Sequence, residues 1–151
     1  IWESLAICET IADAHPELWP ADPLQRAKAR SIACEMHASF TGLRTMMPMD
    51  MVNEYKGAGR AINVRADVAR IHSLWEECLA TNTNGGPFLF GAFGVVDAMF
   101  APVVSRFKTY DVTGSDAINE YCAAFWELDA MKDWLKDAKV EFETTGPLVE
   151  F

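Results

Sequence analysis

The sequence has no long apolar run, although half of its 151 residues are hydrophobic. A helix that crosses a membrane needs about 20 consecutive apolar residues. No segment approaches that length, so the sequence predicts no membrane span and no membrane partner.

Basic residues are few and scattered, with 13 Lys and Arg against 22 Asp and Glu and a formal net charge of −9. Nucleic acids and anionic membrane surfaces are bound by clustered Lys and Arg. The charge pattern therefore argues against both as partners.

Closely spaced cysteines are also missing. Cys8, Cys34, Cys78 and Cys122 form no CxxC pair and have no histidine at ligand spacing. Each lies in a helical pattern, which predicts buried free thiols and no metal site. Free thiols of this kind suit a reducing, cytoplasmic location.

The chain opens Ile1-Trp2-Glu3-Ser4, without an initiator Met, a basic segment or a small-residue cleavage site. We expect neither a signal peptide nor a natural start here, and we expect the chain to be part of a longer protein.

Strand-like alternation is nearly absent, whereas apolar residues recur at intervals of three and four, which predicts an all-α fold. The expected helices are 3–14, a long helix from Pro23 to near Pro48, one that Asn63 caps and whose buried face extends to Leu79, then 95–110, 115–128 and 131–139. A loop is expected over 50–61, and no pattern is evident after Glu141.

Two helix starts carry recognisable caps. Asp22-Pro23 has an N-cap residue followed by proline at the first helical position. Asp97 stands three residues after Gly94 and can accept a hydrogen bond from the Gly94 N–H, as in a capping box. The run Pro87 to Gly91 is too short for a helix, and we expect its apolar side chains to be buried.

Two places could carry chemistry. Glu3-Ser4 puts a carboxylate and a hydroxyl at the opening of a helix, where unpaired N–H groups favour an anion; a plain N-cap role for Ser4 is the simpler interpretation. His37 lies beside the Met36 and Phe40 stripe, where a structural histidine is the simpler interpretation. No triad order, phosphate-binding glycine loop or metal cluster is present.

The order of these features resembles that of bacterial glutathione transferases. Its elements are Glu3-Ser4, then Trp19-Pro20, then Asp22-Pro23 with Arg26 and Arg30, and finally the run Gly86-Pro87-Phe88-Leu89-Phe90-Gly91 leading to Asp97. The last run is the most specific part.

The resemblance implies a glutathione transferase C-terminal-like helical bundle, preceded by one helix left over from a thioredoxin-like domain. Residues 1–15 would be that last helix, 16–22 the linker and 23–151 the all-helical C-terminal domain. The parent would be a cytoplasmic homodimer that joins the thiol of glutathione, its co-substrate, to a small hydrophobic electrophile in detoxification, without a metal. The chain alone is expected to be inactive, because the residue that contacts the thiol and the cis-proline would lie upstream.

The resemblance also implies residue roles. Glu3 and Ser4 would hold the γ-glutamyl end of glutathione, Glu3 at its ammonium group and Ser4 at its carboxylate. His37 matches a histidine near the glutathione sulfur in beta-like members and is an auxiliary catalytic candidate. Phe40, Arg44 and Arg106 are candidates for the electrophile pocket. The family usually has Ser or Thr in place of Gly94, so only half of the capping box can form here.

Two other interpretations remain open. The chain could belong to a non-catalytic, transferase-like scaffold or interaction module, which the lack of a thiol-contacting residue upstream would favour. It could also be an independent helical domain with an accidental likeness, which would behave as a simple monomer.

Overall fold

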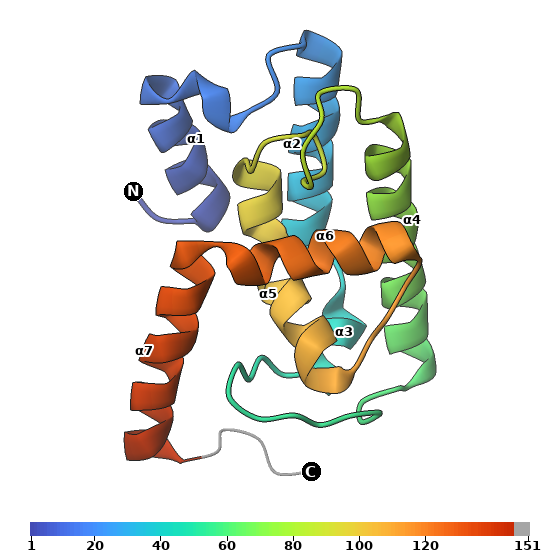
Figure 1. Cartoon of the computed structure of the whole chain (residues 1–151), viewed down its shortest axis with the longest axis vertical. Helices are drawn as coiled ribbons and strands as arrows, with labels where there is room; N and C mark the ends of the chain where they lie inside the picture. The colour runs from blue at the N-terminus through green and yellow to red at the C-terminus, as the bar shows by residue number, and fades with distance from the viewer. Residues whose placement is uncertain (147–151) are drawn as a thin grey trace. The chain divides into compact units, whose positions relative to one another are not determined.

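The structure, a computed structural model, describes residues 1–146, which form helices and no strand (Figure 1). The elements are α1 (Ser4–Ala14), the 3₁₀ helix η1 (Pro16–Leu18), α2 (Pro23–Ala38), α3 (Thr41–Met46), α4 (Ile62–Thr81), α5 (Val95–Tyr110), α6 (Asp116–Glu127) and α7 (Asp129–Thr145). The all-α prediction is confirmed. The last five residues of the expected 23–151 domain lie outside the described part. Within residues 1–146, no helix has the length and apolarity to cross a membrane.

The chain divides into two compact units. The first unit combines Ile1–Ser39 with Leu74–Ala101. Ile32 and Met36 of α2 are buried there, and Trp75 packs edge-on against Phe100 with ring centroids 5.3 Å apart. Of the residues of α1, only Ala12 is buried, and Ile11 is 48% exposed. The outer face of α1 is therefore apolar and open.

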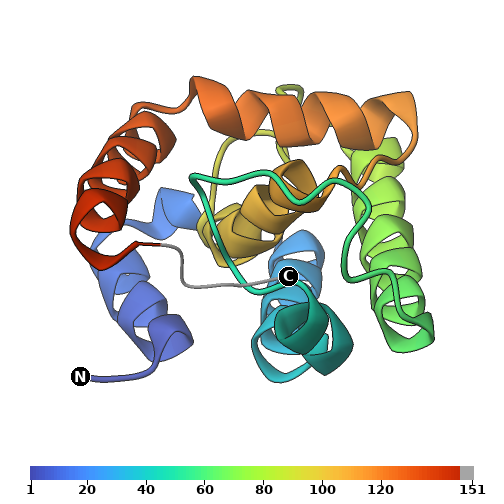
Figure 2. The same ribbon diagram turned by 90° about the horizontal axis from the view of Figure 1, so that it is seen from below.

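The second unit combines Phe40–Ser73 with the chain from Pro102 onward. Within it α6 and α7 contact each other, and the chain changes direction between them at Leu128 (Figure 2). Tyr121 and Phe125 of α6 are buried and pack edge-on, with centroids 5.0 Å apart. Their spacing of four residues is the interval that predicted a helix here.

The prediction of one long helix from Pro23 to near Pro48 is wrong, because the helix ends at Ala38. Ser39 is extended, and Phe40 adopts the left-handed conformation with φ 61° before α3 begins at Thr41. Phe40 is only 5% exposed, so its ring still joins the core. The apolar spacing runs through the break and hides it in the sequence.

Two smaller expectations about helix ends also need correction. α4 begins at Ile62, so Asn63 lies inside the first turn and does not cap the helix. α7 begins at Asp129 and extends to Thr145, beyond the expected 131–139, because the four-residue spacing of Trp134, Ala138 and Phe142 continues along one side.

The four cysteines are free, as expected, but they are not all buried. Cys78 is buried, Cys8 and Cys122 are half-buried, and Cys34 is exposed. In the short run before α5, Phe88 and Leu89 are buried, and the N–H and C=O groups of Phe88 and Gly91 pair with each other.

Candidate functional site

The start of α1 has an unusual backbone. Glu3 is the N-cap residue, and its φ of 70° and ψ of 122° lie in a region that non-glycine residues rarely occupy. Its side chain makes no capping hydrogen bond. Ser4 is the first helical residue, so the interpretation of Ser4 as the N-cap is wrong. The N–H groups of the first turn consequently have no side-chain acceptor from the cap, and Ser4 is exposed beside them.

His37, near the end of α2, reaches the Glu3 carboxylate, with 3.1 Å between Nε2 and Oε2. Both side chains are exposed. Within the first unit the structure thus brings Glu3, Ser4 and His37 to the same end of the α1–α2 pair. Sequence spacing alone does not indicate this contact.

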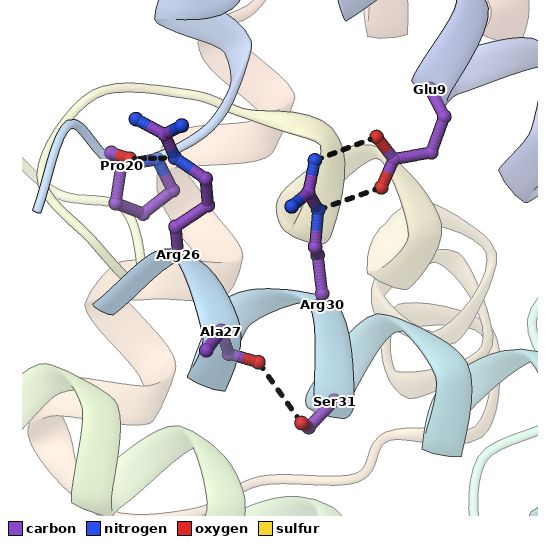
Figure 3. A network of polar contacts seen from close by, with 6 residues as sticks. All are labelled: Glu9, Pro20, Arg26, Ala27, Arg30 and Ser31. Carbon is purple, nitrogen blue, oxygen red and sulfur yellow. Dashed lines mark hydrogen bonds and ion pairs between the residues drawn. The ribbon is translucent and has the colours of Figure 1, made fainter. Parts of the chain in front are cut away.

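An ion pair holds α1 against α2. The Arg30 guanidinium donates from Nε and Nη2 to the two carboxylate oxygens of Glu9, at 2.9 and 3.0 Å (Figure 3). Two parallel bonds of this kind fix both angle and distance. The Arg30 guanidinium also lies 5.5 Å from the centre of the Trp19 ring. Because α2 carries His37, this pair helps to set where His37 meets Glu3.

The linker is tied down by α2. Arg26 donates from Nε to the Pro20 carbonyl at 2.9 Å (Figure 3). It also donates from Nη2 to the Ala21 carbonyl at 3.0 Å. Asp22 caps the helix by accepting from the N–H groups of Leu24 and Gln25. The Asp22-Pro23 cap therefore forms as the sequence predicted.

The start of α5 is organised by a fully buried carboxylate. Asp97 Oδ2 accepts from the Gly94 N–H at 2.9 Å, and Oδ1 accepts from the Leu89 N–H at 3.2 Å. A Cβ atom at Gly94 would lie 2.7 Å from the Leu18 carbonyl oxygen. A residue with a side chain at position 94 would therefore require the linker to move.

Phe40, Arg44 and Arg106 all belong to the second unit. Arg106 donates from Nε to the Met47 carbonyl at 2.8 Å and from Nη1 to the Pro102 carbonyl at 2.9 Å. Burial lowers the pKa of Arg106, and the nearby positive charge of Arg44 lowers it further. The charge of Arg44 therefore acts on Arg106, whereas Phe40 is buried in the core.

The sequence did not single out Asp50, which organises the loop between α3 and α4. It accepts hydrogen bonds from the N–H groups of Val52 and Asn53, the Asn53 amide and the Tyr55 hydroxyl. Burial alone would raise the pKa of Asp50, but these hydrogen bonds outweigh it and the pKa is lowered. An aspartate side chain that accepts from the N–H groups two and three residues later is typical of an Asx-turn. The preference of aspartate for such turns could have identified Asp50 from the sequence.

Two of the cysteines are poor nucleophiles in the folded chain. Burial raises the pKa of Cys78 to about 11 and that of Cys122 to about 12, so both remain thiols at neutral pH. Within residues 1–146, no three His, Cys, Asp or Glu side chains are grouped so that they could hold a metal ion.

Comparison with known proteins places this arrangement in a family. Residues 37–137 match the family described as glutathione S-transferase, C-terminal domain. No curated protein gives a significant match. The matched stretch begins at His37 and includes Gly94, Asp97 and Arg106, and Glu3 and Ser4 precede it. Since the match covers most of the sequence and the fold is all-helical, the chain belongs to the family of glutathione S-transferase C-terminal domains.

Proposed function

We propose that this chain is the helical part of a glutathione transferase and also supplies part of its glutathione site. In the reaction, the glutathione thiolate forms a sulfur–carbon bond with the electrophile, and the leaving group departs with its electron pair. The thiol proton passes to solvent. The observation that carries the proposal is the start of α1, where Glu3, Ser4 and unpaired helix N–H groups meet.

Each group at this end of α1 has a complementary partner in the γ-glutamyl end of glutathione. The free N–H groups of the first turn and the Ser4 hydroxyl can donate to its α-carboxylate, which the positive end of the helix also attracts. The Glu3 carboxylate can accept from its ammonium group. Charge-assisted hydrogen bonds of this kind are the strong ones.

The position of His37 favours a role at the γ-glutamyl end. Its contact is with the Glu3 carboxylate, at 3.1 Å. We therefore assign His37 to holding that carboxylate in place, instead of to the sulfur position that the resemblance suggested. It is a positioning residue in this proposal.

The second substrate would lie against the helical domain. The Arg106 guanidinium is held by two backbone carbonyls, so its orientation is set before any ligand arrives. Its charge and that of Arg44, which acts on it, would give the electrophile pocket a positive wall. Phe40 is buried and precedes α3, so its contribution is to seat the helix that carries Arg44.

The open apolar face of α1 fits the same proposal. Ile7 and Ile11 are exposed, and in a complete transferase they would pack against the thioredoxin-like domain. Exposed apolar patches of this kind mark contact surfaces. A homodimeric parent, a cytoplasmic location and a role in detoxification belong to this proposal as well.

The test is glutathione binding by titration calorimetry, together with turnover of 1-chloro-2,4-dinitrobenzene. Both are measured on this chain and on a protein in which a thioredoxin-like domain precedes it. We expect turnover only in the longer protein. There, Ser4→Ala should weaken glutathione binding by about 10- to 100-fold, the effect of losing one hydrogen bond to a charged group.

Matched substitutions serve as controls. Ser31→Ala removes an exposed hydroxyl from α2, and Glu120→Gln removes an exposed carboxylate from α6. Both should bind glutathione as the unsubstituted protein does, whereas Glu3→Gln should not. If the longer protein neither binds glutathione nor turns over the electrophile, the enzyme proposal fails and the scaffold interpretation replaces it.

A further inference from the structure

A cavity of about 340 Å³ lies in the second unit, beside the first half of α4. Its apolar lining comes from Met47, Val64, Val68 and Val112, and Arg60 and Arg65 also line it. It shares no residue with the groups proposed to hold glutathione or the electrophile. Its size is at the lower end of the range for small-molecule sites.

Local packing fixes the walls of this cavity. Val64 and Val68 are one helical turn apart on α4, so they point to the same side. Gly59 has φ 68°, and a Cβ atom there would lie 2.3 Å from the Met46 carbonyl oxygen, so the loop lies directly against the end of α3. Arg60 follows at once and donates from Nη2 to the Asp111 carbonyl at 3.1 Å. The cavity therefore exists before any ligand binds.

The charge at the cavity is positive on an otherwise acidic chain. The Arg65 guanidinium makes no hydrogen bond or ion pair with any residue in 1–146, and Arg60 makes only its bond to a backbone carbonyl. The acidic residue of the lining is Asp111, whose charge also acts on Lys56 and helps to raise the pKa of Lys56, after the larger effect of Glu54. His72 adds no negative charge.

The acidic residue of α4 that is nearest to Arg65 in the sequence is Asp67, and its carboxylate already has a partner. The Asp67 carboxylate accepts from the Leu43 N–H at 2.8 Å and so serves the start of α3. Two guanidinium groups over an apolar floor suit a ligand with one anionic end and one hydrocarbon end, since arginine pairs with carboxylates through two parallel hydrogen bonds.

We propose that this cavity binds a small organic acid with a hydrocarbon tail. The carboxylate lies between Arg60 and Arg65, and the tail lies along Val64, Val68 and Val112. This site is independent of the proposed transferase reaction.

The probe is octanoate, measured by titration calorimetry and by amide chemical shifts of the ¹⁵N-labelled chain. Two ligands with the same tail are the comparison: 1-octanol, which lacks the charge, and octylamine, which reverses it. We expect octanoate to bind at least about tenfold more tightly than 1-octanol, the size of one charge-assisted hydrogen bond, and octylamine to bind worst. Shifts should centre on Val64, Val68 and Thr113.

Substitutions separate the cavity from general effects of charge. Arg65→Gln should weaken octanoate binding by about tenfold and leave 1-octanol unaffected. Val68→Phe, which fills the floor, should weaken both ligands. Lys136→Met removes a positive charge from an exposed position on α7 outside the cavity and should change neither.

Three results would overturn the proposal: no octanoate binding at millimolar concentration, equal affinity for octanoate and 1-octanol, or equal effects of Arg65→Gln and Lys136→Met. Circular dichroism of each variant shows whether it has folded, and Arg65→Gln changes an exposed side chain, so it tests the site even if Val68→Phe unfolds. Glu3→Gln should leave octanoate binding intact, which keeps this result separate from the glutathione proposal.

Discussion

Replacing Gly94 with the serine that is usual in the family should destabilise this chain. Serine is a better N-cap residue than glycine, but only by a few tenths of a kcal/mol. Against that gain, its Cβ would lie 2.7 Å from the Leu18 carbonyl oxygen. Carbon and oxygen in contact normally lie about 3.3 Å apart or more, so the linker would have to move by roughly 0.6 Å.

The free-energy cost of moving the linker decides whether Gly94→Ser stabilises or destabilises the chain. Forcing extra atoms into a closely packed site typically costs about 1–3 kcal/mol. We therefore expect Gly94→Ser to lower the free energy of unfolding by about 1–2 kcal/mol, which corresponds to a fall in Tm of about 2–8 °C for a chain of this size. Urea unfolding of the 151-residue chain, followed by far-UV circular dichroism, measures the change.

A second substitution separates packing from capping. Gly94→Ala brings the same Cβ without a hydroxyl, so it should be less stable than Gly94→Ser by about 0.5–2 kcal/mol, the usual worth of a capping side chain. Ala92→Ser adds a hydroxyl at a nearby exposed position and should have little effect. If Gly94→Ser is as stable as the unsubstituted chain or more so, the linker does not restrict position 94 and the reasoning is wrong.

Three further predictions concern other sites. Hydrogen bonds lower the pKa of Asp50 in the folded chain. Its carboxylate therefore stabilises the fold at pH values above the unfolded pKa near 3.9, and this stabilisation is lost as the pH falls through the folded pKa. Asp50→Asn should lower the free energy of unfolding at pH 7 and lower it less at pH 3, as the midpoints of urea unfolding would show. Asp22→Ala should cost about 1 kcal/mol, because the N–H groups of α2 lose their cap, and thermal unfolding measures it. Cys34, which is exposed, should react first with a thiol reagent. Cys122, which is half-buried and has a raised pKa, should react slowly, and the buried Cys78 should react only on unfolding; a fast phase that persists in Cys34→Ser would contradict this.

The helices that the sequence predicted best are those with both a clear apolar period and a recognisable end. α2 begins at Pro23, behind the Asp22 cap, and α5 spans Val95–Tyr110 as expected. The break at Phe40 could not be predicted, because left-handed residues between helices are usually Gly or Asn, and phenylalanine gives no such signal. Local propensity is consistent with one helix there, and the tertiary packing of Phe40 overrides it.

The candidate site was predictable in its residue types and not in its contacts. A carboxylate and a hydroxyl at a helix start can be recognised from the sequence alone, so Glu3 and Ser4 were accessible. The contact between Glu3 and His37 depends on how α1 packs on α2, through the pair Arg30–Glu9. The cavity beside α4 likewise depends on Arg60 reaching the end of α5 across the loop. Contacts between residues far apart in sequence carry no local signal.

The backbone at Glu3 argues for function more strongly than its side chain does. A non-glycine residue at φ 70° costs on the order of 1–3 kcal/mol and persists only where its surroundings impose it. Little packing does so here, because Ile1 and Trp2 are highly exposed and Glu3 itself is exposed. Two contacts hold Glu3 in this conformation. The Ile7 N–H donates to the Glu3 carbonyl, and the Glu3 carboxylate contacts His37. The glutathione site proposed above accounts for strain at a position that contributes nothing to the core, beside a helix start whose cap residue supplies no side-chain acceptor.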